Sequence, residues 1–134
     1  MARIPKEVQE FVKNKIAWVA TASPDGVPNT TPKGTVRFID DERIVFADLF
    51  SRKTRDNLQK NPKIAVAVMD LEKRQGYQFK GSAQLVDSGP IFDQVVEQLK
   101  KAPMQLPHPK YVVIINVDSV FDQSIGPKAG QQIA

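Results

Sequence analysis

The chain has 134 residues, of which 41% are apolar and 25% are charged. This length and composition are those of one globular domain with a sizeable core, and no apolar run approaches the roughly 20 residues of a membrane span. The net charge of +4 suits an anionic small molecule and permits a nucleic acid without requiring one. Because there is no cysteine, disulfides, thiolate metal sites and thiol catalysis are excluded. The first ten residues hold no apolar signal-peptide core, so we expect a cytoplasmic location and a single domain over residues 1–134.

The early part of the chain predicts a helix followed by a pair of strands. Pro5–Asn14 has apolar residues at helical spacing, and Ile16–Ala22 is rich in strand formers. The Ser-Pro-Asp-Gly sequence at 23–26 is typical of a tight turn, so Val27–Phe38 is expected to return antiparallel to the first strand. Two prolines and a glycine interrupt this second strand, which predicts an edge or bulged strand of the kind that often lies beside a binding site.

Four further stretches predict the remaining strands. Arg43–Asp48 is a strand that leads directly into a helix, and Lys63–Asp70 is so apolar that we expect it to be buried on both faces. Gly76–Asp87 alternates between apolar and polar residues, and Gly81 predicts a bulge within it. Tyr111–Val117 is the most strand-like run of the chain, and the residues that follow it can extend the strand.

The element count favours a mainly β fold. Ser88–Lys101 predicts a second amphipathic helix with its lysines correctly placed at the end, and the last ten residues are expected to be a tail. The total is six strands and three helices, with hairpin-type turns and no βαβ alternation. A small antiparallel barrel with short helices fits this pattern better than a doubly wound sheet.

The helix predicted within Ser51–Pro62 contains few apolar residues. Ser51 is suited to cap its first turn, and Asn61 precedes a proline, which ends it. Leu58 is its only strongly apolar residue, so packing against a core does not by itself account for the segment.

The charge at the start of this helix is unusual. Arg52, Lys53 and Arg55 crowd a helix end where the macrodipole is already positive and acidic residues are normally preferred. An anion would make this arrangement favourable, because free N–H groups, the hydroxyls of Ser51 and Thr54 and the Lys53 ammonium would together bind a phosphate. The alternative interpretation is a solvated basic helix without a ligand.

Side chains for acid–base or nucleophilic catalysis are scarce. His108 is the only histidine and lies between two prolines, where we expect a surface position. The acidic run Asp40–Glu42 is interpreted as a solvated turn rather than a metal site, since no histidine is near it. The chain also lacks the glycine-rich motifs of dinucleotide-binding and P-loop folds. This combination is typical of a protein whose chemistry is carried by a phosphorylated cofactor.

The chain resembles the FMN-binding split barrel of the pyridoxamine 5'-phosphate oxidase-like family in four stretches. They are ATASPDGVPNTTP at 20–32, IVFADLFSRKTRDNLQKNPKIAVAVMD at 44–70, YQFKGSAQLVDSGPIF at 77–92 and YVVIINVDSVFD at 111–122. The second is the most specific, because in this family a Ser-Arg-Lys segment between strand and helix, followed by a leucine and an Asn-Pro stop, binds the FMN phosphate. The resemblance implies a six-stranded antiparallel split β-barrel with short helices that forms a homodimer with FMN at its interface.

The resemblance also implies which residues hold the cofactor. Ser51, Lys53 and Thr54 would bind the phosphate, with Arg52 or Arg55 assisting. The flavin would be lined by the interrupted strand at Thr30, Thr31, Pro32 and Lys33. Its pyrimidine edge would be followed, largely through backbone groups, by Ala47, Asp48 and Leu49 at the end of the strand before the helix. Tyr111–Val117 and Phe121 would face the second subunit.

The expected function is that of an FMN-binding flavoprotein, either an oxidoreductase or an electron-transfer protein. The resemblance is to the compact single-domain members rather than to the full oxidase, so oxidation of vitamin B6 is not expected. NAD(P)H or a redox protein is the expected electron donor, and the deazaflavin F420 remains an alternative cofactor. The leading interpretation involves neither a nucleic acid nor a membrane. A second interpretation is a nucleic-acid-binding small β-barrel that uses the basic helix at 51–60, and a third is a structural barrel without a cofactor.

Overall fold

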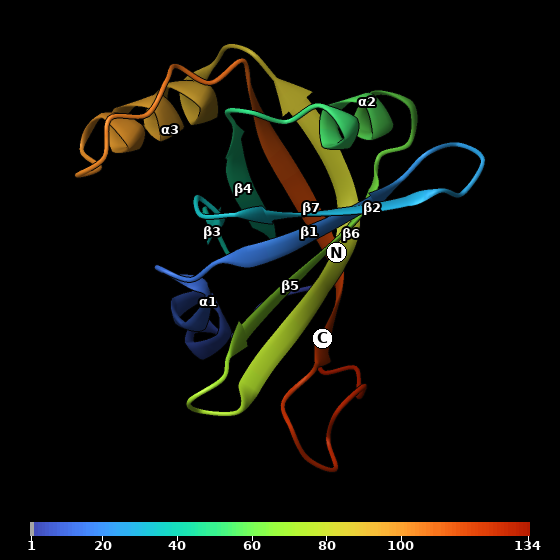
Figure 1. The fold of residues 1–134 in the computed structure, drawn as a ribbon. Coiled ribbons are helices and arrows are strands. Elements are labelled where there is room, and N and C mark those ends of the chain that lie inside the picture. Colours follow the sequence, from blue (N-terminus) through green and yellow to red (C-terminus); the bar gives the residue numbers. More distant parts are fainter. Residues whose placement is uncertain (1) are drawn as a thin grey trace.

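The computed structural model describes residues 2–134, which form a curled antiparallel sheet with three short helices (Figure 1). The seven strands are β1 (Ala17–Ala22), β2 (Pro28–Lys33), β3 (Arg37–Phe38), β4 (Arg43–Asp48), β5 (Lys63–Asp70), β6 (Gln75–Val86) and β7 (Tyr111–Asp122). The helices are α1 (Lys6–Val12), α2 (Lys53–Lys60) and α3 (Pro90–Lys100). None of these helices is long and apolar enough to cross a membrane.

The sheet has the strand order β2-β1-β5-β6-β7-β4-β3. Its two edge strands, β2 and β3, are consecutive in the chain and are joined only by the residues at 34–36. An extended chain spans at most about 3.6 Å per residue, so the four steps from Lys33 to Arg37 keep the two edges within roughly 14 Å. The sheet therefore curls into a barrel that stays open along one line, which we call the seam. This is the split β-barrel that the resemblance implies.

The strand count differs from the prediction because one predicted strand is divided. Val27–Phe38 forms two strands rather than one, since β2 pairs with β1 whereas β3 pairs with β4. The chain must leave the sheet at Gly34 to cross the seam between them. Six predicted strands thus become seven. The edge position of β2 is confirmed, and it is the position at which Pro28 and Pro32 are tolerated.

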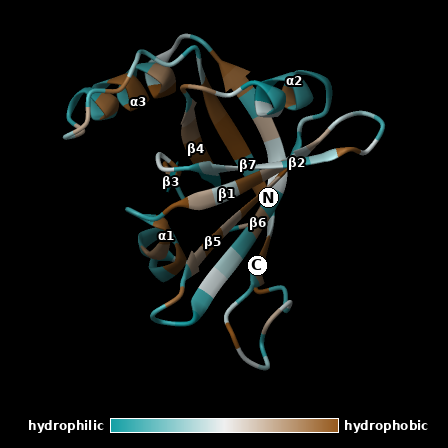
Figure 2. Cartoon of the chain, viewed as in Figure 1, coloured by the Kyte–Doolittle hydropathy of each residue, from teal (hydrophilic) through white to brown (hydrophobic). Residues whose placement is uncertain are grey.

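The core has two parts, one inside the barrel and one outside it. Inside the barrel, the largest fully buried side chains include Phe46 and Phe79. Outside it, Phe92 and Val95 of α3 pack with Val45, Ala47, Val112 and Ile114 on the outer face of β4 and β7. Figure 2 shows β4 and β7 largely in the colours of hydrophobic residues, as expected for strands buried on both faces.

The prediction that the strand Lys63–Asp70 is buried on both faces is wrong, although its bounds are those of β5. Exposed and buried residues alternate along β5, because α3 covers β4 and β7 instead. The outer face of β5 therefore remains exposed in the described residues of this chain.

The bulge predicted at Gly81 is confirmed. The pairing of β6 with β7 shifts its register between Lys80 and Gly81. After β7 the chain forms a loop and returns to it, where the N–H of Ile133 donates to the carbonyl of Val120 at 2.8 Å. The last residues therefore run beside the end of β7.

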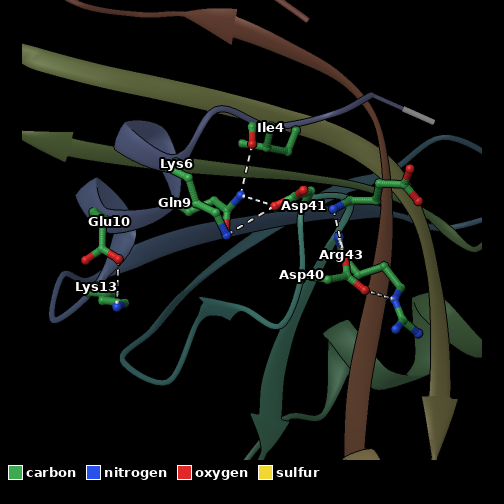
Figure 3. A network of polar contacts seen from close by, with 9 residues as sticks. Ile4, Lys6, Gln9, Glu10, Lys13, Asp40, Asp41 and Arg43 are labelled. Atoms are coloured by element: carbon green, nitrogen blue, oxygen red, sulfur yellow. Dashed lines mark hydrogen bonds and ion pairs between the residues drawn. The ribbon is translucent and has the colours of Figure 1, made fainter.

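The acidic run Asp40–Glu42 forms the turn between β3 and β4, as predicted (Figure 3). The carboxylate of Asp40 is 2.8 Å from Nε of Arg43, and that of Asp41 accepts a hydrogen bond of 3.0 Å from Nε2 of Gln9 on α1. This hydrogen bond ties α1 to the turn and so to the sheet. Within residues 2–134 no group of three or more His, Cys, Asp or Glu side chains is arranged to hold a metal ion.

Candidate functional site

A cavity of about 400 Å³ lies at the seam, a volume within the range of pockets that bind small molecules. Its walls are the strand β2 with the crossing after it, the end of β4 with the loop that follows, and the start of α2. The lining residues are Asn29, Thr30, Thr31, Pro32, Lys33, Gly34, Thr35, Ala47, Leu49, Phe50, Ser51, Arg52, Lys53 and Thr54. We call this the first cavity.

The first cavity brings together ten of the eleven residues that the sequence analysis assigns to the cofactor; the exception is Asp48. Sequence reasoning missed four lining residues, Asn29, Gly34, Thr35 and Phe50. Two of them had a signal: Asn29 lies two positions before Thr31 and so shares its face of the strand, and Phe50 lies between two assigned residues. That the assigned residues bind a cofactor stays a prediction.

Lys33 reaches across the first cavity from β2 to the loop before α2. Its Nζ donates a hydrogen bond of 2.6 Å to Oγ of Ser51. Partial burial lowers the pKa of Lys33, and Arg55 adds to this while the charge of Asp48 opposes it. Among the described residues, no carboxylate lies within 4.0 Å of this ammonium group. Its charge is therefore available to an anion in the first cavity.

The start of α2 lacks the cap that the sequence predicts. The helix begins at Lys53 with Arg52 as its N-cap residue, and no side chain caps it. The Ser51 hydroxyl accepts a hydrogen bond from Lys33 instead. The first N–H groups of a helix have no partner within the helix, so these donors remain available beside the cations of the first cavity.

Asp48 stabilises the loop from behind the first cavity instead of lining it. The side chain is 2% exposed, with Oδ2 2.6 Å from Nε of Arg55 and Oδ1 accepting a 3.1 Å hydrogen bond from the N–H of Ser51. Burial by itself would raise the pKa of Asp48, but the hydrogen bonds from Arg55 and Ser51 outweigh it and hold the pKa below its ordinary value. The side chain of Asp48 is therefore not part of the cavity lining, and a contact of its backbone with a cofactor stays a prediction.

Arg55 is engaged in the same ion pair. The hydrogen bond to Asp48 raises the pKa of Arg55, and its side chain is only 20% exposed. Because Arg55 does not line the first cavity, the cations that do so are Lys33, Arg52 and Lys53.

Hydrogen bonds between side chains fix α2 relative to the edge of the sheet. Nδ2 of Asn57 donates to Oγ1 of Thr21 on β1 at 3.0 Å, and both side chains are buried. Nδ2 of Asn29 on β2 donates to Oγ1 of Thr54 at 3.3 Å. These bonds hold α2 against β1 and against β2, and so fix the start of α2 relative to the β2 wall of the first cavity.

The residues of the first cavity fit the phosphate of FMN. Its three cations face no acidic lining residue, and the uncapped helix start adds N–H donors. Phosphate groups in proteins are bound by this combination of helix N–H groups, hydroxyls and cationic side chains.

Two other predictions concern residues away from the first cavity. His108 is exposed in the loop before β7, with its ring centroid 5.6 Å from that of Phe92, in agreement with the expected surface position. The prediction that Tyr111–Val117 faces a second subunit is wrong for most of the segment. Its apolar residues from Val112 to Ile115, and Val117, are at most 6% exposed within one chain because α3 and the core cover them.

Comparisons with known proteins agree with this fold. The family model described as pyridoxamine 5'-phosphate oxidase matches residues 4–123. The protein MJ0282 of Methanocaldococcus jannaschii is 32% identical over the whole of this chain and 90% of its own length. The crystal structure of HupZ from Group A Streptococcus is 31% identical with a TM-score of 0.84, over 95% of this chain and 99% of that one.

A solved structure of lower sequence identity is similar to this chain in its fold. An FMN-binding protein from Syntrophomonas wolfei is 20% identical with a TM-score of 0.76, over 90% of this chain and 89% of that one. Since the family match covers most of the sequence, the chain belongs to the pyridoxamine 5'-phosphate oxidase family.

Proposed function

We propose that the protein binds FMN in the first cavity and transfers hydride or electrons through it. The observation that carries the proposal is the set of three cations, Lys33, Arg52 and Lys53, gathered around an uncapped helix start with no acidic residue in the lining. Membership of the family and the shared fold of an FMN-binding protein support this choice of anion.

Each wall of the first cavity has its own part in this proposal. Lys53 and Arg52 bind the phosphate together with the hydroxyls of Ser51 and Thr54 and the N–H groups of α2. The flavin ring lies along β2, from Thr30 to Lys33, and against Ala47 and Leu49 at the end of β4. FMN supplies the hydride or electron chemistry when it is bound, and the protein supplies position and electrostatics. A catalytic histidine is therefore not required.

A second copy of the chain would cover the exposed outer face of β1 and β5. Trp18 is 50% exposed and Met69 is 42% exposed on this face, and Ala67 lies opposite Trp18 in the strand pairing. A contiguous exposed apolar patch of this kind is typical of an interface. Trp18 also pairs with Pro32, which lines the first cavity, so a partner on this face would border the cofactor. We propose a two-fold symmetric homodimer with two equivalent cofactor sites.

The test is a visible spectrum of the purified protein, with identification by mass of whatever heat releases. Titration of cofactor-free protein with FMN and with F420 distinguishes the two cofactors. Oxidation of NADH or NADPH by the loaded protein distinguishes an enzyme from an electron carrier. A colourless protein that takes up neither cofactor in excess would contradict the proposal.

Lys53→Ala is expected to weaken FMN binding by about 1.5–3 kcal/mol, or roughly 10- to 150-fold, the range for hydrogen bonds to charged groups. The measurement is a fluorescence titration of cofactor-free protein with FMN. Lys60→Ala is the matched control, because it removes the same charge from the exposed far end of α2. Equal affinities of the two variants would discredit the phosphate site.

Lys33→Ala is expected to lower the reduction potential of bound FMN, because a nearby cation favours the added negative charge. Each 1.4 kcal/mol of lost interaction corresponds to about 30 mV for a two-electron couple, so we expect a shift on the order of 30 mV. Redox titration measures it, and Lys33→Arg should keep the original potential by keeping the charge. An unchanged potential in Lys33→Ala would remove this role from Lys33.

A further inference from the structure

A second cavity, of about 520 Å³, lies between the end of α1, the strand β3 and α3. It shares Gly34 and Thr35 with the first cavity, so the two are neighbours across the seam. Six of its twelve lining residues are apolar, and these include Phe38 of β3 and Leu99 of α3. A concave space that combines apolar walls with a few polar groups is the usual form of a small-molecule site.

Arg37 is the unusual residue of this second cavity. Its Nη2 is shielded from solvent and has no hydrogen-bond partner among the described residues. No carboxylate of residues 2–134 lies within 4.0 Å of its guanidinium, whereas Arg43 and Arg55 each pair with an aspartate. Burial lowers the pKa of Arg37, as expected when a charge loses water without gaining a partner. Arg37 as a whole is only partly buried and lines the second cavity, so an anion there would offset the loss of water around its unpaired charge.

The rest of the lining indicates what that acceptor would be. No acidic residue lines the second cavity, and the other cation there, Lys13, is exposed and has its Nζ 3.0 Å from Oε1 of Glu10. Arg37 therefore supplies the one unmatched charge in a lining that is otherwise apolar or uncharged apart from Lys13. A guanidinium binds a carboxylate through two parallel hydrogen bonds, which suits a single planar anionic group.

We propose that the second cavity binds an amphipathic organic anion, with its carboxylate on Arg37 and its apolar body against Phe38, Val95 and Leu99. This goes beyond the proposed function and does not depend on which cofactor occupies the first cavity. The bound anion would lie next to that cofactor, on the other side of Gly34 and Thr35.

The experiment is a calorimetric titration of the full chain, loaded with FMN, with decanoate and with decanol. These probes have the same apolar chain and differ in the carboxylate. We expect the wild type to bind one decanoate per chain and to bind decanol at least about tenfold more weakly. Arg37→Gln should lower the affinity for decanoate at least about tenfold and leave the affinity for decanol unchanged. Arg74→Gln is the matched control, because it removes an exposed arginine from the turn between β5 and β6 and should change neither affinity.

Several results would overturn the proposal. One is the absence of decanoate binding to the wild type, and another is an Arg37→Gln variant that binds decanoate as tightly as the wild type does. A third is displacement of decanoate by FMN from cofactor-free protein, because that would place the anion in the first cavity. Should Arg37→Gln fail to fold, Ala102→Phe provides the second test, since it fills the second cavity and should abolish binding of both probes. Retained binding in Ala102→Phe would also contradict the assignment. A chain that binds decanoate but no FMN would contradict only the proposed function.

Discussion

Asp48→Ala is expected to lower the free energy of unfolding by about 3 kcal/mol. The change leaves the Arg55 guanidinium and the N–H of Ser51 without their acceptor in a buried position. Removing one partner of a buried ion pair costs about 3–5 kcal/mol, and the lower figure applies because Arg55 keeps 20% of its side chain exposed. Urea denaturation monitored by circular dichroism measures the difference.

The control for this prediction is Glu97→Ala. Glu97 also pairs with a cation, Lys100, at 3.3 Å, but both side chains are exposed, and such pairs contribute less than about 1 kcal/mol. If the two variants lose equal stability, the ion pair behind the first cavity has no special role. We also expect Asp48→Ala to weaken FMN binding, because the loop that carries Ser51 loses its anchor.

The pH dependence of the same pair has a definite sign. The pKa of Asp48 is held below its ordinary value of 3.8, so the native state favours the ionised carboxylate. The stability that Asp48 contributes should be fully present above pH 3.8 and be lost as the pH falls through its lower native pKa. The difference in stability between the wild type and Asp48→Asn should shrink over that acidic range.

Gly81→Ala is expected to destabilise the protein by about 3 kcal/mol or more, the upper end of the usual effect of overpacking. A Cβ at this position would lie 2.0 Å from the carbonyl oxygen of Asn116 and 2.9 Å from its carbonyl carbon. Both are backbone atoms of β7, so relief requires the β6–β7 pairing to move at its register shift. Thermal or urea unfolding measures the loss.

Gly34→Ala is the matched control for this change. A Cβ at Gly34 would meet only the end of the Ile16 side chain, at 3.8 Å, which is an ordinary contact. An alanine that fits its site reduces the entropy of the unfolded chain and stabilises by about 0.4–1 kcal/mol. Similar stabilities of the two variants would show that the sheet tolerates a side chain at the bulge.

The sequence predicted best the features that depend on local patterns. The bounds of β5, the edge position of β2 and the bulge at Gly81 follow from residue alternation and from the backbone limits of proline and glycine. The two stretches that line the first cavity were found through the unusual charge at the start of α2 and through the resemblance to a family.

The features that were missed depend on contacts between distant residues. An apolar run does not show which strand a helix covers. The sequence therefore predicts that β5 is buried on both faces and that β7 faces a partner, whereas α3 covers β7 and leaves the outer face of β5 exposed. Ser51 is a good helix cap by type, but Lys33, 18 positions earlier, takes its hydroxyl. The direction of the Asp48 side chain is likewise set by Arg55 on the next element.

The open seam also bears on whether chains can associate through their strand edges. An unpaired strand edge presents free N–H and C=O groups that can template growth of an intermolecular sheet. Here one edge carries Pro28 and Pro32, which have no N–H to donate, and the other edge, β3, is only two residues long. The barrel can therefore remain unclosed beside its cavities while offering another chain little backbone on which to aggregate.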